Sequence, residues 1–341
     1  MPAEWEPHAS TWLSWPHNKI SWPGKLLKDV ERIYREMITA LLPYETVNLL
    51  VPSKAEAVRI MRSLDGSKAP LSRLVIHEVK TADAWIRDYG PIFVVGPRGK
   101  KKAFTKWIFN AWGGKYADLV RDTRVVDKIR TLKNVTRFDV RRVLEGGSID
   151  VNGRGTCLAT EQCLLTSTRN PDLTREGIEK MLFENLGVRN VVWLKEGIEA
   201  DDTDGHVDDI TRFVGPSTIV TAVETDRSDK NRGPLHENLS ILLKSHDQNG
   251  RPFRVIELPM PGIVGPGGRR DGDQNRLPAS YSNFYIANGT VLVPIYGKRN
   301  DSEALKIIKS QFKDRKVVGI ECTSLVYGLG SIHCVTQQEP R

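Results

Sequence analysis

The sequence is poor in cysteine: its 341 residues contain four, Cys157, Cys163, Cys322 and Cys334. No two of them form a CxxC pair, which argues against a structural zinc site, and so few do not make a disulfide framework. A reducing compartment, the cytoplasm, is therefore the expected location. No run of about 18 apolar residues occurs, so no membrane-spanning helix is predicted. The acidic start Met1–Glu6 lacks the basic and apolar regions of a signal peptide.

The sequence also lacks a concentrated basic region, although its formal net charge is +8. Lysine and arginine are spread along the chain, and the tight runs Lys100–Lys102 and Arg269–Arg270 follow glycine, as solvated turn tips do. Nucleic acid is therefore not the expected partner. Acidic residues are less evenly spread, because the segment Glu199–Asp209 surrounds His206 with carboxylates. A locally acidic site on a basic protein indicates a cationic ligand.

Three segments of the second half look like copies of one another. Each begins with turn residues that lead into a strand, continues into a helical pattern and ends in another strand. Their spacing of about 60 to 70 residues is typical of a strand–strand–helix–strand unit and too long for the common helical repeats. The turn-and-strand starts are Gly153–Thr160, Gly215–Thr221 and Asn288–Pro294, the predicted helices are Arg175–Leu186, His236–Ser245 and Ser302–Phe312, and the predicted closing strands are Asn190–Leu194, Phe253–Leu258 and Lys316–Glu321.

The first half contains looser versions of the same unit. Helical patterns at Asp29–Leu42 and Ala55–Leu64 each precede a strand pattern, and Ile92–Val95 with Ala103–Phe109 is predicted to form a hairpin. About five units result, and repeats that each leave an edge and an apolar face can close into a ring around a channel. The pattern therefore predicts one α/β domain of pseudo-fivefold symmetry. No low-complexity linker interrupts the chain, so residues 1–341 are predicted to form a single domain.

The last strand-like segment carries a cysteine in an unusual setting. Cys334 ends an apolar run, follows the turn Gly328–Ser331 and has His333 directly before it. A cysteine in such a place acts as a nucleophile if a base and some positive charge lie nearby. The alternative is a buried, inert thiol, and this segment alone favours that alternative.

Two segments in the first half place a carboxylate at the entrance of a strand. Asp83–Pro91 crowds charges and aromatic rings, Asp88 among them, before a Gly-Pro end. Leu144–Ile149 places Glu145 before two glycines, which let a backbone or a ligand approach closely. Ordinary turns, salt-bridged in the first case, are the alternative for both.

A third segment, Asp202–Asp209, combines a histidine with carboxylates. A strand that continues through Val207 would put His206 and Asp208 on the same face, because side chains alternate along a strand. The pair would then be a base with a charge partner. A structural histidine and a metal site are the alternatives.

These four segments enter or leave strands of different units, so we expect them to meet at the mouth of the ring. The site would hold a thiol, an imidazole and the carboxylates of Asp88, Glu145 and Asp208. Three carboxylates repel an oxyanion and raise a thiol's pKa, which disfavours a protease or an acyltransferase. They favour a substrate that is itself a cation, and guanidinium fits best because its planar fork pairs with carboxylates bidentately. Trp85 and Trp112 either line the substrate's alkyl tail or belong to the core.

The same segments carry a family resemblance that runs nearly end to end. The matching motifs are Met1–Trp5, Thr11–Pro16, Trp85–Asp88, Phe109–Gly114, Leu144–Ile149, Asp204–Asp208, Ala279–Gly289 and Gly330–Cys334. On these motifs the chain resembles the agmatine deiminases, which belong to the guanidine-modifying enzymes. The resemblance implies a five-bladed pseudo-symmetric α/β propeller built from strand–strand–helix–strand repeats.

The resemblance also implies a role for each candidate site residue. Cys334 corresponds to the nucleophile and His206 to the general acid and base. Glu145 supports the histidine, while Asp88 and Asp208 hold the guanidinium. The family uses no metal and no organic cofactor, and its members often form homodimers.

The implied reaction converts agmatine into N-carbamoylputrescine and ammonia through a thiouronium intermediate on Cys334, a step of polyamine biosynthesis. One alternative is a deiminase of free arginine or peptidyl-arginine, for which Arg269 or Arg270 would bind the far end of the substrate. An amidinotransferase would need an amine acceptor in place of water. A non-catalytic binder of polyamines or nucleic acid would have an unreactive Cys334. Arg269–Asp273 and Lys115–Val135 match the family loosely, so they bear on substrate preference.

Overall fold

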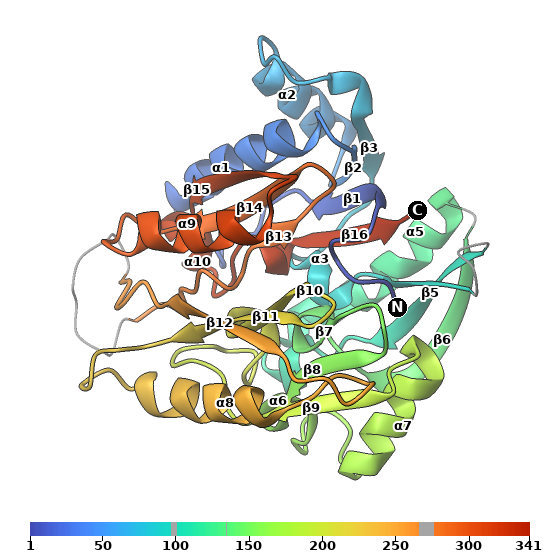
Figure 1. The fold of residues 1–341 in the computed structure, drawn as a ribbon. Coiled ribbons are helices and arrows are strands. Elements are labelled where there is room, and N and C mark those ends of the chain that lie inside the picture. Colours follow the sequence, from blue (N-terminus) through green and yellow to red (C-terminus); the bar gives the residue numbers. More distant parts are fainter. Residues whose placement is uncertain (97–100, 134, 266–275) are drawn as a thin grey trace.

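The computed structural model describes residues 1–96, 101–133, 135–265 and 276–341 (Figure 1). Within these residues the strands form five separate sheets, one of four strands and four of three strands each. Helices connect the strands of each sheet, and parallel and antiparallel pairs occur together. The chain is therefore an α/β protein with mixed sheets, which confirms the predicted class. Arg269 and Arg270 lie outside the described residues.

The four smaller sheets repeat one arrangement. In each, the first strand pairs antiparallel with the second, and the second pairs parallel with the third after a helical crossover. This is the predicted strand–strand–helix–strand unit, including the hairpin in the first half. The strands are β4 (Ile92–Val95), β5 (Lys102–Ile108) and β6 (Thr136–Val143); β7 (Asp150–Val151), β8 (Thr156–Thr160) and β9 (Asn190–Leu194); β10 (Thr211–Gly215), β11 (Thr218–Val223) and β12 (Arg254–Pro259); and β13 (Tyr285–Ile286), β14 (Thr290–Ile295) and β15 (Lys316–Glu321).

The four-stranded sheet joins the two ends of the chain. Its strands lie in the order β16 (Thr336–Pro340), β1 (His8–Ser14), β2 (Thr46–Val51) and β3 (Leu74–Glu78). The last strand of the chain pairs antiparallel with the first, and Figure 1 shows the two termini on the same side of the molecule. Because β16 starts two residues after Cys334, this pairing fixes that cysteine beside the N-terminal sheet.

The longer helices lie toward the outside of the molecule, whereas α3 lies near its middle (Figure 1). The α-helices are α1 (Leu26–Leu41), α2 (Lys54–Leu64), α3 (Ile86–Tyr89), α4 (Ala111–Gly114), α5 (Val125–Lys133), α6 (Glu161–Leu164), α7 (Arg175–Leu186), α8 (Arg232–Lys244), α9 (Asp301–Gln311) and α10 (Thr323–Val326). The 3-10 helices are η1 (Leu71–Arg73), η3 (Ala117–Arg124), η4 (Gly146–Ser148), η5 (Val207–Asp209) and η8 (His333–Val335). No helix in this described part of the chain is long and apolar enough to span a bilayer.

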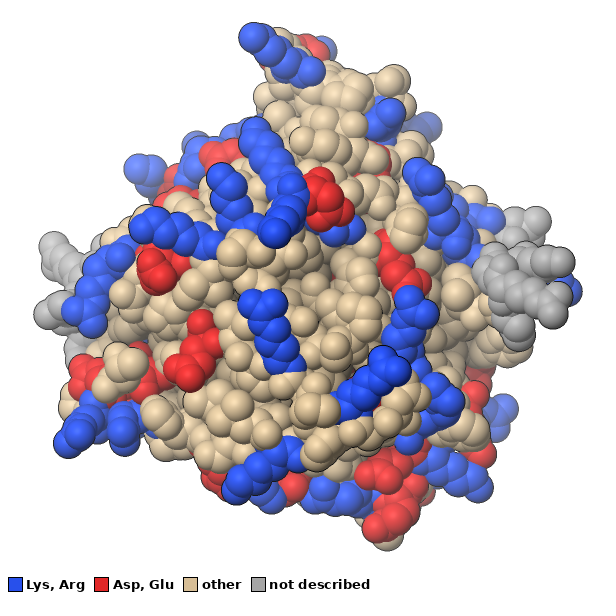
Figure 2. Space-filling view, in the orientation of Figure 1, with Lys and Arg blue, Asp and Glu red and all other residues tan. Residues whose placement is uncertain are grey.

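The predicted elements agree closely with the observed ones. The predicted helix Arg175–Leu186 has the bounds of α7, and its start is fixed by Thr174, whose hydroxyl accepts a hydrogen bond from the backbone N–H of Gly177. The predicted helix His236–Ser245 begins four residues too late, because Gly233 and Pro234 are typical of a turn in the sequence, whereas the first turn of a helix tolerates proline. Charged side chains on the face shown in Figure 2 are scattered, with Lys and Arg interspersed with Asp and Glu.

A buried ion network ties the N-terminal segment to strands of other sheets. The guanidinium of Arg212 on β10 donates to the carboxylate of Asp150 on β7 and, at 2.9 Å, to Glu4. Its remaining nitrogen donates at 2.7 Å to the carbonyl oxygen of Phe284, next to β13. Arg212 is 1% exposed. Without it Asp150 would be left as an uncompensated buried charge, whereas Glu4 would keep only His333 and Arg87 as partners.

We therefore expect Arg212→Met to lower the free energy of unfolding by about 3–5 kcal/mol, the usual cost of breaking a buried ion pair. The measurement is urea denaturation at neutral pH. Arg32→Met is the control, because Arg32 pairs with Glu36 on the surface of α1 and both side chains are 44% exposed. That change should cost only about 0.3–0.5 kcal/mol. Equal effects of the two substitutions would contradict the structural role of Arg212.

Candidate active site

A pocket with a volume of about 480 Å³ contains four of the seven predicted site residues in its wall, namely Trp85, Asp88, Trp112 and Cys334. Further wall residues come from the loop before α1, from α4 and η3, from the loop before His206 and from the turn before η8; they are Asn18, Ile20, Ser21, Lys115, Tyr116, Ala117, Asp118, Leu119, Asp202, Thr203, Tyr327, Gly328, Leu329 and Gly330. A wider groove over α1 and β15 contains none of the predicted residues.

Cys334 lies in a tight turn at the wall of the pocket. It is the central residue of η8, directly before β16, and is 5% exposed. The sequence predicted a cysteine at the end of a strand, whereas the structure places it in a 3-10 turn that precedes one. The turn depends on Gly330, because a Cβ there would lie 2.5 Å from the ring of Trp85 and 3.2 Å from Cβ of Cys334. Glycine therefore lets the tryptophan and the thiol share one wall.

Asp88 is held by two hydrogen bonds that come from separate parts of the chain. Its Oδ2 accepts from the indole N–H of Trp112 at 2.9 Å, and its Oδ1 accepts from the backbone N–H of Gly147 at 3.0 Å. Burial, followed by the charges of Asp208 and Glu145, raises the pKa of Asp88 well above its ordinary value. The carboxyl group is thus fixed in position but is costly to ionise while the pocket is empty.

His206 lies next to Asp88, with Nδ1 3.8 Å from its Oδ1. The predicted strand through Val207 is wrong: the segment forms the 3-10 helix η5, and His206 precedes its first residue. His206 and Asp208 nevertheless face the same point, because a Cβ at Gly147 would lie 2.6 Å from His206 Nδ1 and 3.0 Å from a carboxylate oxygen of Asp208. Position 147 therefore requires glycine, since any side chain there would occupy the space that His206 and Asp208 face.

Burial lowers the pKa of His206 to about 3, although the carboxylate of Asp208 acts in the opposite direction. The imidazole is therefore neutral in the empty pocket at physiological pH. Neither of its ring nitrogens has a hydrogen-bond partner among the described residues. A neutral imidazole with free nitrogens is able to accept a proton from one group and return it to another.

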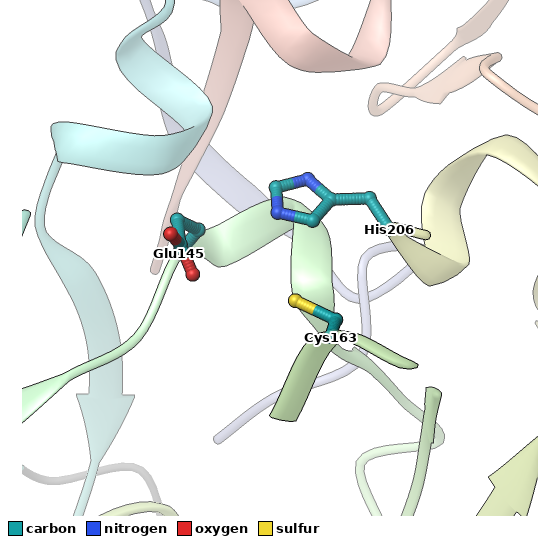
Figure 3. Close-up of side chains that lie close together, drawn as sticks. All are labelled: Glu145, Cys163 and His206. Atoms are coloured by element: carbon teal, nitrogen blue, oxygen red, sulfur yellow. The ribbon is translucent and has the colours of Figure 1, made fainter. Parts of the chain in front are cut away.

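Glu145 lies close to His206, as the sequence suggested (Figure 3). A carboxylate oxygen of Glu145, a ring nitrogen of His206 and the sulfur of Cys163 all lie within 4.8 Å of one another. Glu145 accepts a hydrogen bond at 2.8 Å from Arg169, and both side chains are fully buried. Burial raises the pKa of Glu145 while the Arg169 cation opposes that rise. Arg169 and Cys163 were not among the predicted site residues, and no motif in the sequence marks them.

Asp208 contacts His333, a residue to which the sequence assigned no role. Its Oδ2 lies 2.6 Å from Nδ1 of His333, whose Nε2 lies 2.8 Å from Glu4 Oε2. The same Oδ2 lies 3.9 Å from the sulfur of Cys334. Burial alone would raise the pKa of Asp208, but the hydrogen bond and charge of His333 outweigh it and lower the pKa. In the sequence, the only sign of these contacts is the position of His333 directly before Cys334.

The sulfur of Cys334 is surrounded by negative charge, as the sequence predicted. Burial, then the charges of Asp208, Asp209 and Asp88, raise the pKa of the thiol well above its ordinary value. The thiol is therefore protonated in the empty pocket. A cation in the pocket would reverse this effect by attracting the thiolate and the carboxylates together.

Several buried polar atoms at this site lack partners among the described residues. They are Oε2 of Glu145, Oδ1 of Asp208 and both ring nitrogens of His206. Buried polar groups are nearly always hydrogen-bonded, so such a cluster marks a place where a ligand completes the bonding. Most of the unpaired atoms are acceptors, and guanidinium supplies only donors.

Trp85 and Trp112 belong to the hydrophobic core and also form part of the pocket wall. They are 5% and 6% exposed, belong to the largest buried hydrophobic cluster and line the pocket. The indole N–H of Trp112 is occupied by Asp88, so this ring also positions a carboxylate. Beyond it, Lys115 donates to Asp204 at 2.7 Å and Tyr116 donates to Asp202. These two contacts join two loops at the wall of the pocket.

Known proteins of similar sequence and structure belong to one family. The profile of the Porphyromonas-type peptidyl-arginine deiminase family matches residues 1–340, so the chain belongs to this family. An agmatine deiminase from Stutzerimonas stutzeri is 37% identical over 357 residues, which cover 100% of this chain and 95% of the relative. These matches confirm the resemblance described from the sequence motifs.

Solved structures extend the likeness to the whole fold. An agmatine deiminase of Enterococcus faecalis superposes with a TM-score of 0.91 at 35% identity, over 100% of this chain and 95% of that chain. An agmatine deiminase of C. jejuni with a cysteine replaced by serine and with substrate bound has a TM-score of 0.87 at 29% identity, over 100% and 96%.

The raised pKa of Asp88 has a consequence for stability. A carboxyl group whose folded pKa is above its unfolded value of about 3.9 stabilises the fold below that value and loses this contribution as pH rises. We therefore expect Asp88→Asn to gain stability relative to the unsubstituted protein as pH rises from about 4 to 8. The measurement is the difference in thermal midpoint between the two proteins at several pH values.

Asp172→Asn is the control for this experiment. The hydrogen bond from Arg142 lowers the pKa of the exposed Asp172 carboxylate, so its stabilising contribution is present above the unfolded pKa and is lost as pH falls. The relative stability of the control should not increase with pH. A flat or falling difference for Asp88→Asn would show that its carboxyl is not strained by burial and like charge.

Proposed function

We propose that this protein hydrolyses agmatine to N-carbamoylputrescine and ammonia, with Cys334 as nucleophile. The observation that carries the proposal is the gathering of a thiol, a neutral imidazole and several carboxylates around one pocket, with unpaired acceptors among them. The full-length likeness to agmatine deiminases supports the same substrate. The wall of the pocket carries Asp118 and Asp202, and the lysine there, Lys115, is paired with Asp202 and Asp204. This wall therefore favours a substrate with a second cationic end over one that ends in a carboxylate.

The first step begins with a protonated thiol and a neutral imidazole. The guanidinium cation binds between Asp88 and Asp208, and its charge lowers the cost of ionising Cys334. The thiol proton passes to His206, and the thiolate attacks the guanidinium carbon. The carboxylates orient the planar fork so that this carbon faces the sulfur.

The second half of the reaction returns the site to its starting state. His206, now an imidazolium next to Glu145, gives its proton to the departing nitrogen, the C–N bond breaks and ammonia leaves. The substrate carbon remains bound to the sulfur of Cys334 as a thiouronium ion. His206 then takes a proton from water, the hydroxide attacks that carbon and the C–S bond breaks. The new O–H group of the product loses its proton to solvent and becomes the C=O of a urea group, and His206 returns its own proton to the Cys334 thiolate. The scheme uses no metal and no organic cofactor.

The wider architecture is part of the proposal. We infer that the five sheets are the blades of one pseudo-symmetric propeller, because each repeats the same strand order and the sheet of β16 and β1 joins the two ends of the chain. The site residues then lie at the hub, on turns that enter or leave the strands. Residues 1–341 would form this single domain, and the possible homodimer and the cytoplasmic location stay predictions.

A substrate comparison tests the reaction. Agmatine, free arginine and a blocked arginine peptide are incubated with the purified protein, and ureido product and ammonia are measured. We expect agmatine to be the preferred substrate by kcat/KM. If arginine or the peptide is preferred, agmatine is the wrong substrate but the proposed deimination reaction stands. If no guanidine yields product, the non-catalytic binder is favoured.

The nucleophile is tested in the same assay. Cys334→Ser should lower kcat with agmatine by at least about a thousandfold, because a hydroxyl is a far weaker nucleophile than a thiolate. Cys157→Ser is the matched control: Cys157 is also buried, but it lies on β8 outside the pocket. Its kcat should stay within about threefold of the unsubstituted protein. A Cys334→Ser protein of near-full rate would overturn the mechanism.

The guanidinium-binding role of Asp88 has a separate test. Asp88→Ala should lower kcat/KM by at least about thirtyfold, since it removes one partner of a buried charge pair in the complex. Asp172→Ala, at a carboxylate whose side chain is 61% exposed, is the control and should leave kcat/KM unchanged. A loss of less than about tenfold for Asp88→Ala would remove this residue from the binding site.

A further inference from the structure

The amide of Asn283 is the feature of the site that the proposed mechanism has not used. Asn283 lies in the loop before β13, is completely buried and contacts both His333 and Cys334. Its Nδ2 lies 3.2 Å from the sulfur of Cys334. The loop comes from a different sheet than the η8 turn that carries the cysteine, so only the tertiary fold brings them together.

The orientation of this amide follows from its neighbours. The backbone N–H of His333 lies 2.9 Å from Oδ1 of Asn283, and a backbone N–H can only donate. The oxygen of the amide must therefore face His333, and the NH₂ group must face the other way. There, Nδ2 lies 2.9 Å from Oδ1 of Asp209 and close to the sulfur. Its two hydrogens thus have two different acceptors.

A hydrogen-bond donor at this position would stabilise the thiolate form of Cys334. The charged groups that act on the sulfur are the carboxylates of Asp208, Asp209 and Asp88, and each of them opposes the thiolate. A backbone hydrogen bond at Ser331 acts in the opposite direction. Among the side chains that the structure describes, Asn283 supplies the neutral donor that points at the sulfur.

The same amide also suits the protonated thiol. Oδ1 of Asn283 lies 3.6 Å from the sulfur, and Oδ2 of Asp208 lies 3.9 Å from it, so the S–H group has acceptors on either side. When the thiol ionises, the two oxygens no longer have an S–H group from which to accept. The hydrogen bond from Nδ2 becomes stronger, because its acceptor, the sulfur, is then charged. The contact with Nδ2 therefore favours the thiolate over the thiol.

We propose that Asn283 is a catalytic residue that donates an N–H to the Cys334 thiolate and so promotes its formation when substrate binds. This inference rests on the proposed function, because it takes Cys334 as the nucleophile. The proton leaves the sulfur for His206 and no bond to Asn283 is made or broken. Asp209 holds the second hydrogen of the amide, and the His333 backbone holds its oxygen, so the donor stays aimed at the sulfur.

The rival interpretation is a purely structural role, in which Asn283 only holds the η8 turn through the backbone of His333. Two substitutions separate the roles. Asn283→Asp keeps the oxygen that accepts from His333 and replaces the donor to Cys334 with a second oxygen. Asn283→Leu removes both the donor and the acceptor. A structural role predicts damage from the leucine variant alone.

The test measures the thiolate and turnover side by side. The rate of Cys334 alkylation by iodoacetamide is followed from pH 7 to 11, because burial and the nearby carboxylates raise the pKa of this thiol well above its ordinary value. Cys334→Ser is the baseline for the other cysteines. In Asn283→Asp the alkylation midpoint should move to higher pH, and the rate at pH 8 should fall about tenfold to a hundredfold, as for loss of a hydrogen bond to a charged group. With agmatine, kcat should fall by a similar factor while KM changes less than about threefold.

Asn238→Asp is the matched control. Asn238 on α8 is equally buried, and its amide also accepts from one backbone N–H, that of Lys195, and donates to one carbonyl, that of Glu196. It does not contact Cys334, so its alkylation midpoint should match that of the unsubstituted protein. Alkylation and kcat within about twofold of the unsubstituted protein in Asn283→Asp would overturn the inference.

A measurement on the unsubstituted protein keeps the inference testable if both Asn283 variants fail to fold. With asparagine labelled by ¹⁵N, one side-chain amide resonance should shift with pH at the alkylation midpoint, and this shift should be absent in Cys334→Ser. No such resonance would overturn the inference. These readouts report on the thiolate without turnover, so they remain decisive about Asn283 even if Cys334→Ser proves active and the proposed function fails.

Discussion

The burial of several carboxylates around one thiol is the constraint on which the rest of this structure depends. Asp88, Asp208 and Asp209 all act against ionisation of Cys334, and none of them is in open solvent. Such an arrangement is unfavourable without compensation, because like charges in a poorly solvated site repel strongly. The site lowers this cost by keeping Cys334 as a thiol and by raising the pKa of Asp88 and Asp209, which favours their uncharged forms. A bound cation would remove most of it.

The surrounding structure supplies fixed compensation at the edges of the site. Arg169 faces Glu145 on one side, and His333 lies between Asp208 and Glu4 on the other. Arg212 extends the network to Asp150 and Glu4. The centre is left without a cation of its own, and that is the place where a guanidinium substrate would bind.

The repeated sheets provide the rigid frame for this arrangement. Each site residue lies on a short turn or helix next to a strand: Asp88 on α3 before β4, Glu145 before η4, and Asp208 on η5 before β10. The pairing of β16 with β1 then fixes the turn of Cys334 against the N-terminal segment. Rigid strands with short exits hold reactive groups in place at little entropic cost during the reaction. The agmatine deiminase of Enterococcus faecalis shares this fold over the full length of the chain.

The sequence alone determined the repeating unit and the chemistry of the pocket. Apolar periodicity predicted α7 and most strands, because local hydrophobic spacing reflects which face is buried. The motifs around Asp88, Glu145, His206 and Cys334 predicted the candidate reactive groups, because each interrupts that periodicity with charge or glycine. Only the tertiary structure decided which neighbours act on them. Asn283 reaches Cys334 from a different sheet, Arg169 reaches Glu145 from 24 residues along the chain, and the ionisation of His206 depends on its burial. Pairings between distant segments and local dielectric are properties of the folded chain, so no local pattern encodes them.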